Sequence, residues 1–160
     1  MLLELKLLLL ICAANIAPVI AHKVMSNRFN RPVDGGLVLA DGFPLFGASK
    51  TWRGLVAALV LSAAAALLLG LPIPAGLALG AASMCGDLLS SFIKRRLGRA
   101  SSTQFLGLDQ IPEALLPLLV GLAWFDYSWL AMALIVAAFF VLELTTSPLF
   151  YILGIRRRPF

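Results

Sequence analysis

The sequence predicts an all-α, polytopic integral membrane protein with five transmembrane helices in a single membrane domain, residues 1–160. Of the 160 residues, 61% are hydrophobic and only 13% are charged, and the mean hydropathy is +0.95. The apolar residues occur in long blocks, which is typical of membrane spans. A soluble domain of this length with so apolar a composition would aggregate through its surface.

The predicted spans follow the apolar blocks in chain order. They cover about residues 2–21, 54–70, 74–97, 111–125 and 129–153. Prolines at 72 and 74 favour a tight turn between the second and third spans, and residues 125–128 favour one between the fourth and fifth. A G-x-x-x-G pair, Gly76 and Gly80, predicts close helix packing by the third span. The other two connections, residues 22–53 and 98–110, are longer and more polar.

The basic residues predict the orientation of the chain in the membrane. Apart from Lys6, they all lie in the two long connections, at the end of the third span or in the C-terminal tail. They are Lys23, Arg28, Arg31, Lys50, Arg53, Lys94, Arg95, Arg96, Arg99, Arg156, Arg157 and Arg158. Because Lys and Arg collect on the cytosolic side, we expect the N-terminus outside and both loops and the C-terminus in the cytosol. The net charge of +5 then has a topological cause, and we expect no nucleic-acid partner.

An alternative for residues 7–21 is a signal peptide, with Val19 and Ala21 at the −3 and −1 positions of the cleavage site. Cleavage there would tend to place the first basic loop outside and break the charge pattern. The early charges of Glu4 and Lys6 also cancel. We therefore expect an uncleaved first span in a cell-membrane protein.

Polar side chains within the third span are candidate site residues, because polar groups in a bilayer are costly. One helical face of this span carries polar residues at helical spacing: Ser83, Asp87, Ser90, Ser91 and Lys94. Asp87 is 13 residues from Pro74, a helix rise of roughly 20 Å, which places it in the cytosolic half of the bilayer core. Gly86 beside it permits close approach of another backbone or of a ligand. The alternative is a packing face with Asp87 in a salt bridge.

A second polar group precedes the fourth span, where Asp109 lies at a depth compatible with Asp87. Two carboxylates from different helices near basic residues favour a Mg²⁺ site, because Mg²⁺ takes oxygen ligands and is commonly shared with substrate phosphates. A plain helix N-cap is the alternative for Asp109. The same group includes Ser101, Ser102, Gln104, Gln110 and Glu113. For Glu113, and for Glu143 in the fifth span, a place beside the site and a purely local role both stay open.

The long first loop supplies a third polar group. It reads N-R-P-V-D-G-G and then D-G-F-P-L-F-G-A-S-K-T-W-R-G, a turn-rich composition. Gly47 followed by Lys50 and Thr51 is not a P-loop, because two residues intervene before the Lys and no strand precedes it. Small residues with Lys and Arg still suit phosphate binding, and an ordinary basic loop is the alternative. Asn30, Asp34 and Asp41 are expected to shape the loop.

These segments resemble a known enzyme family. G-D-L-L-S-S-F-I-K-R, residues 86–95, is similar to the signature region of CDP-diacylglycerol synthases (phosphatidate cytidylyltransferases), which has S-x-x-K-R and a downstream L-D. R-P-V-D-G-G at 31–36, G-A-S-K-T-W-R-G at 47–54 and L-D-Q-I-P at 108–112 resemble more closely the short archaeal branch, the CDP-archaeol synthases. The chain departs from the broader family in lacking K-D after K-R and in having Pro112 where D-R-x-D has its second Asp.

The resemblance implies a nucleotidyltransferase that joins CTP to a lipid phosphate, either an archaeal-type diether glycerol phosphate or phosphatidate, and releases pyrophosphate. It implies CTP, a membrane lipid phosphate and the bilayer as partners and Mg²⁺ as cofactor; a homodimer is allowed without being required. Asp87 and Asp109 are the implied metal ligands and, with Lys94 and Arg95, the catalytic residues. The implied contacts to CTP or lipid phosphate are Lys50, Thr51, Arg53, Ser91, Ser101, Ser102 and Gln110.

Two other classes of protein explain less of the sequence. A small transporter or channel-like scaffold would account for intramembrane Asp87 and Glu143, but not for charged motifs that converge on the cytosolic side. A CDP-alcohol phosphotransferase would carry D-G-x-x-A-R followed by G-x-x-x-D-x-x-x-D, and that pattern is absent.

Overall fold

A computed structural model describes residues 1–26, 28–101, 103 and 105–152, without the side chains of residues 148–150. It is built from five α-helices. They are α1 (Leu2–Met25), α2 (Trp52–Leu68), α3 (Ile73–Arg96), α4 (Gln110–Gly121) and α5 (Trp129–Ile152). Extended pairing in the described part of the chain is limited to two isolated bridges within the first loop and at its end. The all-α prediction is confirmed.

Three of the helices among the described residues are long and apolar enough to cross a membrane. They are α1, α3 and residues 129–147 of α5, so the chain is a membrane protein, as predicted. Helix α2 has 17 residues and α4 has 12, which gives lengths of about 26 and 18 Å against a hydrocarbon core of about 30 Å. The count of five spans therefore stays a prediction.

The helix ends differ from the predicted span ends where local hydrogen bonding decides them. Helix α1 continues past residue 21 to Met25. Helix α2 begins at Trp52 because the Thr51 hydroxyl caps it, accepting from the Gly54 N–H at 3.4 Å. Helix α4 ends at Gly121 rather than at residue 125, because the next residues form a turn in which the Ala123 N–H donates to the carbonyl of residue 120.

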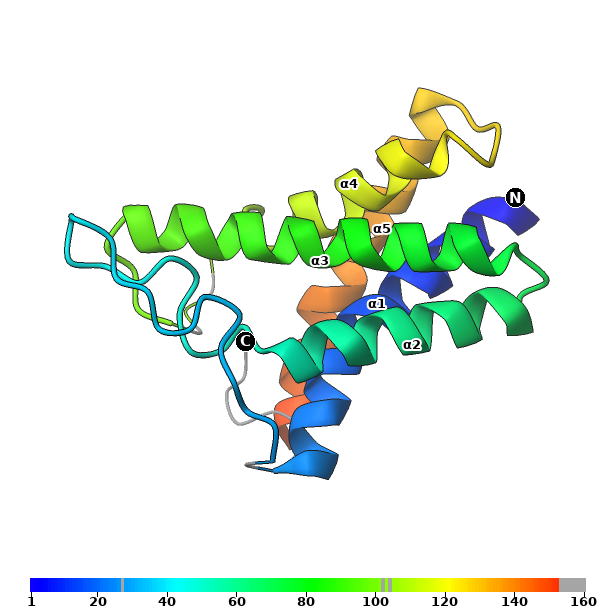
Figure 1. Ribbon diagram of the computed structural model, residues 1–160. Coiled ribbons are helices and arrows are strands. Elements are labelled where there is room, and N and C mark those ends of the chain that lie inside the picture. Colours follow the sequence, from blue (N-terminus) through cyan, green and yellow to red (C-terminus); the bar gives the residue numbers. More distant parts are fainter. Residues whose placement is uncertain (27, 102, 104, 153–160) are drawn as a thin grey trace.

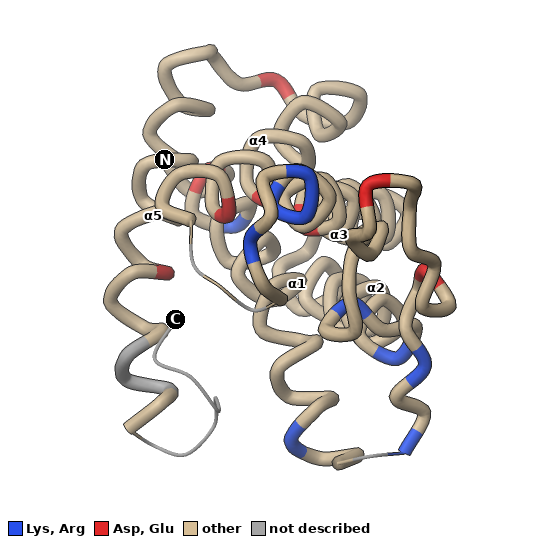
Figure 2. Tube along the Cα trace, turned by 90° about the vertical axis from the view of Figure 1, so that its left-hand side faces the viewer, with Lys and Arg blue, Asp and Glu red and all other residues tan. Residues whose placement is uncertain are grey.

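The helices are arranged so that both long loops meet at one end of the molecule. Helices α2 and α3 run side by side in opposite directions, α4 packs on α3, and α1 and α5 cross behind them (Figure 1). Large apolar side chains of α1, α3, α4 and α5 form the main core, among them Leu7, Ile11, Leu79, Leu118 and Phe139. Seen from the loop end, most Lys and Arg lie on the loops and the adjoining helix ends (Figure 2).

The first loop is shaped by two aspartates, as expected. The Asp34 carboxylate accepts from the backbone N–H groups of Gly36, Phe46 and Gly47 at 2.9–3.0 Å. Burial raises the pKa of Asp34, but these hydrogen bonds outweigh burial and hold the pKa below its usual value. The Asp41 carboxylate accepts from the Arg96 guanidinium at 2.5 Å, which ties the loop to the end of α3.

Candidate active site

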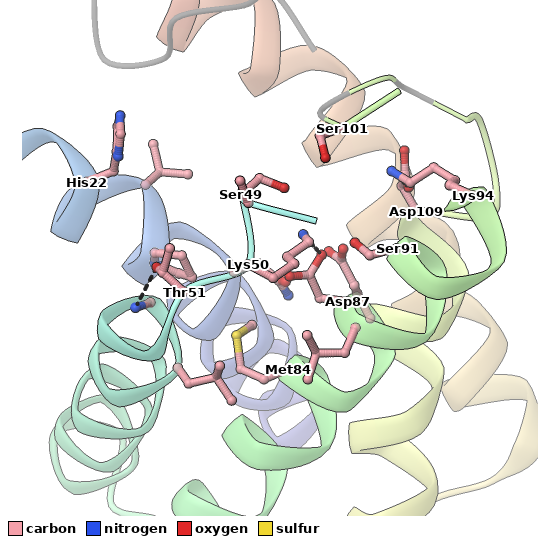
Figure 3. A pocket seen from close by; sticks show the side chains of 18 of the residues that line it. His22, Ser49, Lys50, Thr51, Met84, Asp87, Ser91, Lys94, Ser101 and Asp109 are labelled. Carbon is pink, nitrogen blue, oxygen red and sulfur yellow. Dashed lines mark hydrogen bonds and ion pairs between the residues drawn. The ribbon is translucent and has the colours of Figure 1, made fainter. Parts of the chain in front are cut away.

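A cavity of about 620 Å³ lies between the two loops and the C-terminal half of α3. Its walls come from α1, the first loop, the start of α2, α3, the second loop, α4 and α5. Every predicted site residue that the structure describes lines it, and most of them are labelled in Figure 3. They are Lys50, Thr51, Arg53, Asp87, Ser91, Lys94, Arg95, Ser101, Asp109 and Gln110. The predicted residues Ser102 and Gln104 lie outside the described residues.

An ion pair joins the first loop to α3 within this cavity. The Lys50 ammonium reaches across to the Asp87 carboxylate (Figure 3), and each side chain is 21% exposed. Burial lowers the pKa of Lys50, but the negative charges of Asp87, Glu113 and Asp109 outweigh burial, so that the pKa lies above its usual value. Lys50 is therefore a cation at physiological pH. Asp87 is thus both in a salt bridge and in the cavity, which combines the two alternatives read from the sequence.

A second ion pair joins α3 to the loop before α4. The Lys94 ammonium lies 2.5 Å from one Asp109 carboxylate oxygen and donates to the Thr103 carbonyl at 3.0 Å. The other Asp109 oxygen accepts from the Phe105 N–H at 2.8 Å. The Asp109 side chain makes no capping hydrogen bond to α4, so the alternative of a plain N-cap is wrong. Both Asp109 oxygens are instead held by the loop and by Lys94.

Arg95 and Ser90 fix the second loop against α3. The Arg95 guanidinium donates to the Ser101 hydroxyl at 3.1 Å and to the Ala100 carbonyl at 2.8 Å. The Ser90 hydroxyl lies 2.6 Å from the Leu108 carbonyl, to which it donates. Only 3% of Arg95 is exposed, so its cation lies in the cavity wall and not in open solvent.

Arg53 joins the start of α2 to the end of α1. Its guanidinium donates to the carbonyls of Ser26 at 2.5 Å and Arg28 at 2.8 Å, and lies 2.6 Å from Nδ1 of His22. These contacts hold the two ends of the first loop together. The contact of Arg53 with nucleotide stays a prediction.

The further polar residues that line the cavity include Glu113, Glu143 and Asn15. Glu113 is 7% exposed and lies within hydrogen-bonding reach of Asp87, and Glu143 enters the cavity wall from α5. The sequence had left both open, and the structure places both at the cavity. Asn15 was not predicted: its amide donates to the Ile11 carbonyl at 3.0 Å and to the Ser83 hydroxyl at 2.9 Å. A lone amide in an apolar span was the signal that could have found it.

Gly86 sets the distance between α3 and α4 at the level of Asp87. A Cβ added there would collide with the Pro112 carbonyl oxygen and lie 2.8 Å from the Glu113 backbone nitrogen. The expectation that this glycine permits close backbone approach is confirmed. The close approach brings Glu113 next to Asp87.

The carboxylates of the cavity suit a divalent cation that is shared with a substrate. Within the described ranges no group of three or more His, Cys, Asp or Glu residues is placed to hold a metal by itself. Asp87 and Glu113 are nevertheless close together, and a cation, the Lys50 ammonium, already lies against Asp87. Mg²⁺ commonly takes one or two protein carboxylates and completes its shell with phosphates and water. The cavity therefore fits Mg²⁺ when a substrate brings phosphate oxygens.

Comparison with known proteins agrees with the resemblance in the sequence. Residues 73–160 match a family model described as CarS-like, CDP-archaeol synthase. The chain is 36% identical to the CDP-archaeol synthase of Halorubrum lacusprofundi over 153 residues, which is 81% of this chain and 83% of that one. It is also 36% identical to that of Aeropyrum pernix over 157 residues, 91% of this chain and 84% of that one.

A solved structure has the same fold. It is described as an intramembrane enzyme for archaeal membrane lipids biosynthesis, and it is 32% identical to this chain with a TM-score of 0.74. The similarity covers 88% of this chain and 90% of the solved one.

Proposed function

Because the chain belongs to the CDP-archaeol synthase family, we propose that it joins the cytidylyl group of CTP to the phosphate of a lipid with ether-linked isoprenoid chains, giving a CDP-lipid and pyrophosphate. The coarser prediction, a membrane nucleotidyltransferase of lipid biosynthesis, is confirmed by this membership. Family membership supports the proposed lipid class, and the convergence of the predicted phosphate-binding and acidic residues on one cavity supports the proposed chemistry. A transporter or channel-like scaffold is not favoured.

The reaction needs positioning and charge neutralisation more than proton transfer. An anionic oxygen of the lipid phosphate attacks the α-phosphorus of CTP, and the bond from that phosphorus to the bridging oxygen of the β-phosphate breaks. The electron pair leaves with pyrophosphate. Because the nucleophile is already ionised, no strong general base is required, and the protein contributes alignment and electrostatic stabilisation.

The cavity residues divide into cations and carboxylates with different proposed tasks. Lys94 and Arg95 hold phosphate oxygens of the lipid or nucleotide, and Lys50 holds the triphosphate. Asp87 and Asp109 would hold the metal; Mg²⁺ bound there would neutralise charge on the triphosphate and on the departing pyrophosphate. The remaining proposed contacts are donors around the phosphates and nucleoside: Thr51, Arg53, Ser91, Ser101, Ser102 and Gln110.

We also propose the orientation of the chain, on the distribution of its basic residues. The N-terminus lies outside, the cavity and the C-terminus face the cytosol, and five spans cross the membrane as one domain. A cysteine-free chain with Ala40→Cys or Asp126→Cys, exposed to an impermeant maleimide in intact cells, tests this. We expect labelling at 126 without permeabilisation and at 40 only after it. The reverse pattern would reject the orientation.

Activity is tested on the purified chain with labelled CTP, Mg²⁺ and a panel of lipid phosphates. We expect a CDP-lipid and pyrophosphate, formed faster with a diether glycerol phosphate than with diacyl phosphatidate. A preference for phosphatidate would correct the lipid class. Absence of any CDP-lipid with every lipid phosphate in the panel would reject the proposed function.

A further inference from the structure

The Lys50 ammonium lies against the acidic residues of the cavity. It forms an ion pair with the Asp87 carboxylate, and the negative charges of Glu113 and Asp109 also act on it. Lys50 comes from the first loop, whereas the three carboxylates come from α3, α4 and the loop between them. Figure 3 shows the lysine crossing the cavity to reach Asp87. The positive charge paired with Asp87 therefore comes from a lysine of another segment, as the charge of Lys94 does for Asp109.

The carboxylate beside Asp87 is that of Glu113. Asp109 is engaged on both oxygens, by Lys94 and by the Phe105 N–H. Glu113 lies within reach of Asp87, and the close approach at Gly86 fixes the α4 backbone there. Asp87 and Glu113 thus form an acidic pair whose backbones are held by helix packing, and the Lys50 side chain reaches Asp87 from the first loop.

A divalent cation and the ammonium compete for the same carboxylate oxygens. With both present, the like charges repel in a partly buried cavity where screening is weak. If Lys50 leaves alone, it must find another anion, since an unpaired buried charge is costly. A triphosphate supplies such an anion, because its oxygens accept from an ammonium and also complete the shell of Mg²⁺.

We propose that Lys50 occupies the cation position of the resting enzyme and passes to the triphosphate when CTP binds, which opens Asp87 and Glu113 to the metal. The proposal rests on the proposed function, because a nucleoside triphosphate is the ligand that draws the lysine away. Metal and nucleotide then bind cooperatively, and each strengthens the binding of the other by the same factor. Glu113 is accordingly a residue of the metal site, added to the predicted Asp87 and Asp109.

The test is metal binding without nucleotide, measured with Mn²⁺ as the probe by the electron paramagnetic resonance signal of the free ion. Removing the competing ammonium with Lys50→Met should tighten Mn²⁺ binding by about tenfold or more relative to the unaltered chain, within the usual range of coupling between sites. Lys23→Met removes the same charge from an exposed position outside the cavity and should leave Mn²⁺ affinity unchanged. Unchanged or weaker binding in Lys50→Met overturns the proposal.

A second variant keeps the test decisive and locates the ligands. Glu113→Gln added to Lys50→Met should return Mn²⁺ affinity toward that of the unaltered chain, and no change would remove Glu113 from the site. If Lys50→Met does not fold, the Mn²⁺ affinity of the unaltered chain is measured with and without the α,β-methylene analogue of CTP. The values are corrected for metal bound by free nucleotide. Equal Mn²⁺ affinity in the two measurements overturns the proposal. If CDP-lipid forms but Lys50→Met does not tighten Mn²⁺ binding, only this inference is rejected. If Lys50→Met tightens Mn²⁺ binding but no CDP-lipid forms, only the proposed function is rejected.

Discussion

The two halves of α3 are held to their neighbours by different interactions. In the first half, a Cβ at Gly76 would meet Ala66 of α2 and lie 2.8 Å from the Ser62 carbonyl oxygen, and a Cβ at Gly80 would lie 2.5 Å from the Ser62 hydroxyl oxygen. In the second half, Asp87 and Lys94 are paired with charges from other segments. Shape fixes the first half, whereas the second half combines the close approach at Gly86 with compensated charge. Changes of volume in the first half should therefore act on stability, and changes of charge in the second half should act on activity.

The largest expected effect is that of Asp87→Asn in the polar half. The substitution keeps the size of the side chain and removes the charge that faces Lys50 and the proposed metal. We expect CDP-lipid synthesis to fall on the order of 1,000-fold, the scale on which loss of one transition-state contact acts. Rates are compared at equal amounts of folded protein, judged by size-exclusion profile in detergent. Asp126→Asn, on the exposed α4–α5 turn, is the control and should keep the rate of the unaltered chain. A normal rate in Asp87→Asn would show that Asp87 of α3 takes no part in the reaction.

An intermediate effect is expected from Gly76→Leu in the other half. The added side chain must displace Ala66 or the Ser62 backbone of α2, and overpacking of this kind costs about 1–3 kcal/mol. The melting temperature in detergent should fall, while the rate per folded molecule stays close to that of the unaltered chain. Ala81→Leu places the same side chain at an exposed position of the same helix and should change neither. A stable Gly76→Leu protein with lost activity would contradict the division between the halves.

The smallest effect concerns the loop that docks on the polar half. Backbone hydrogen bonds hold the pKa of Asp34 below its usual value, so its ionised form stabilises the folded loop. That contribution is present above the pKa of an unfolded aspartate, about 3.9, and is lost as the pH falls through the lower folded value. The difference in melting temperature between the unaltered chain and Asp34→Asn should shrink between pH 5 and pH 2. A constant difference would show that Asp34 does not act through its charge.

The helices of this structure could be predicted from the sequence more fully than the contacts between segments. Long apolar blocks and the Gly76–Gly80 pair carry strong local signals, and the helices and the close packing of α3 at these glycines are found where they were expected. The end of α4 was misplaced because the turn after Gly121 is as apolar as the helix before it. Periodicity therefore gave no sign of the boundary.

The residues that line the cavity could largely be predicted from the sequence, but the contacts between them could not. Helical spacing and motif resemblance brought Asp87, Lys94 and Lys50 into one group, and all three line the cavity. Which lysine pairs with which aspartate depends on the fold of two loops, and no local pattern encodes that. Asn15 and Glu113 were missed or left open for the same reason, because their partners lie on helices distant in sequence.

The most direct test of these proposals is an experimental structure of the chain with CTP and Mg²⁺. We predict the triphosphate between the first loop and the C-terminal half of α3, Lys50 on its phosphate oxygens, and the metal against Asp87. A nucleotide bound elsewhere, or Lys50 still paired with Asp87 beside a bound triphosphate, would contradict them.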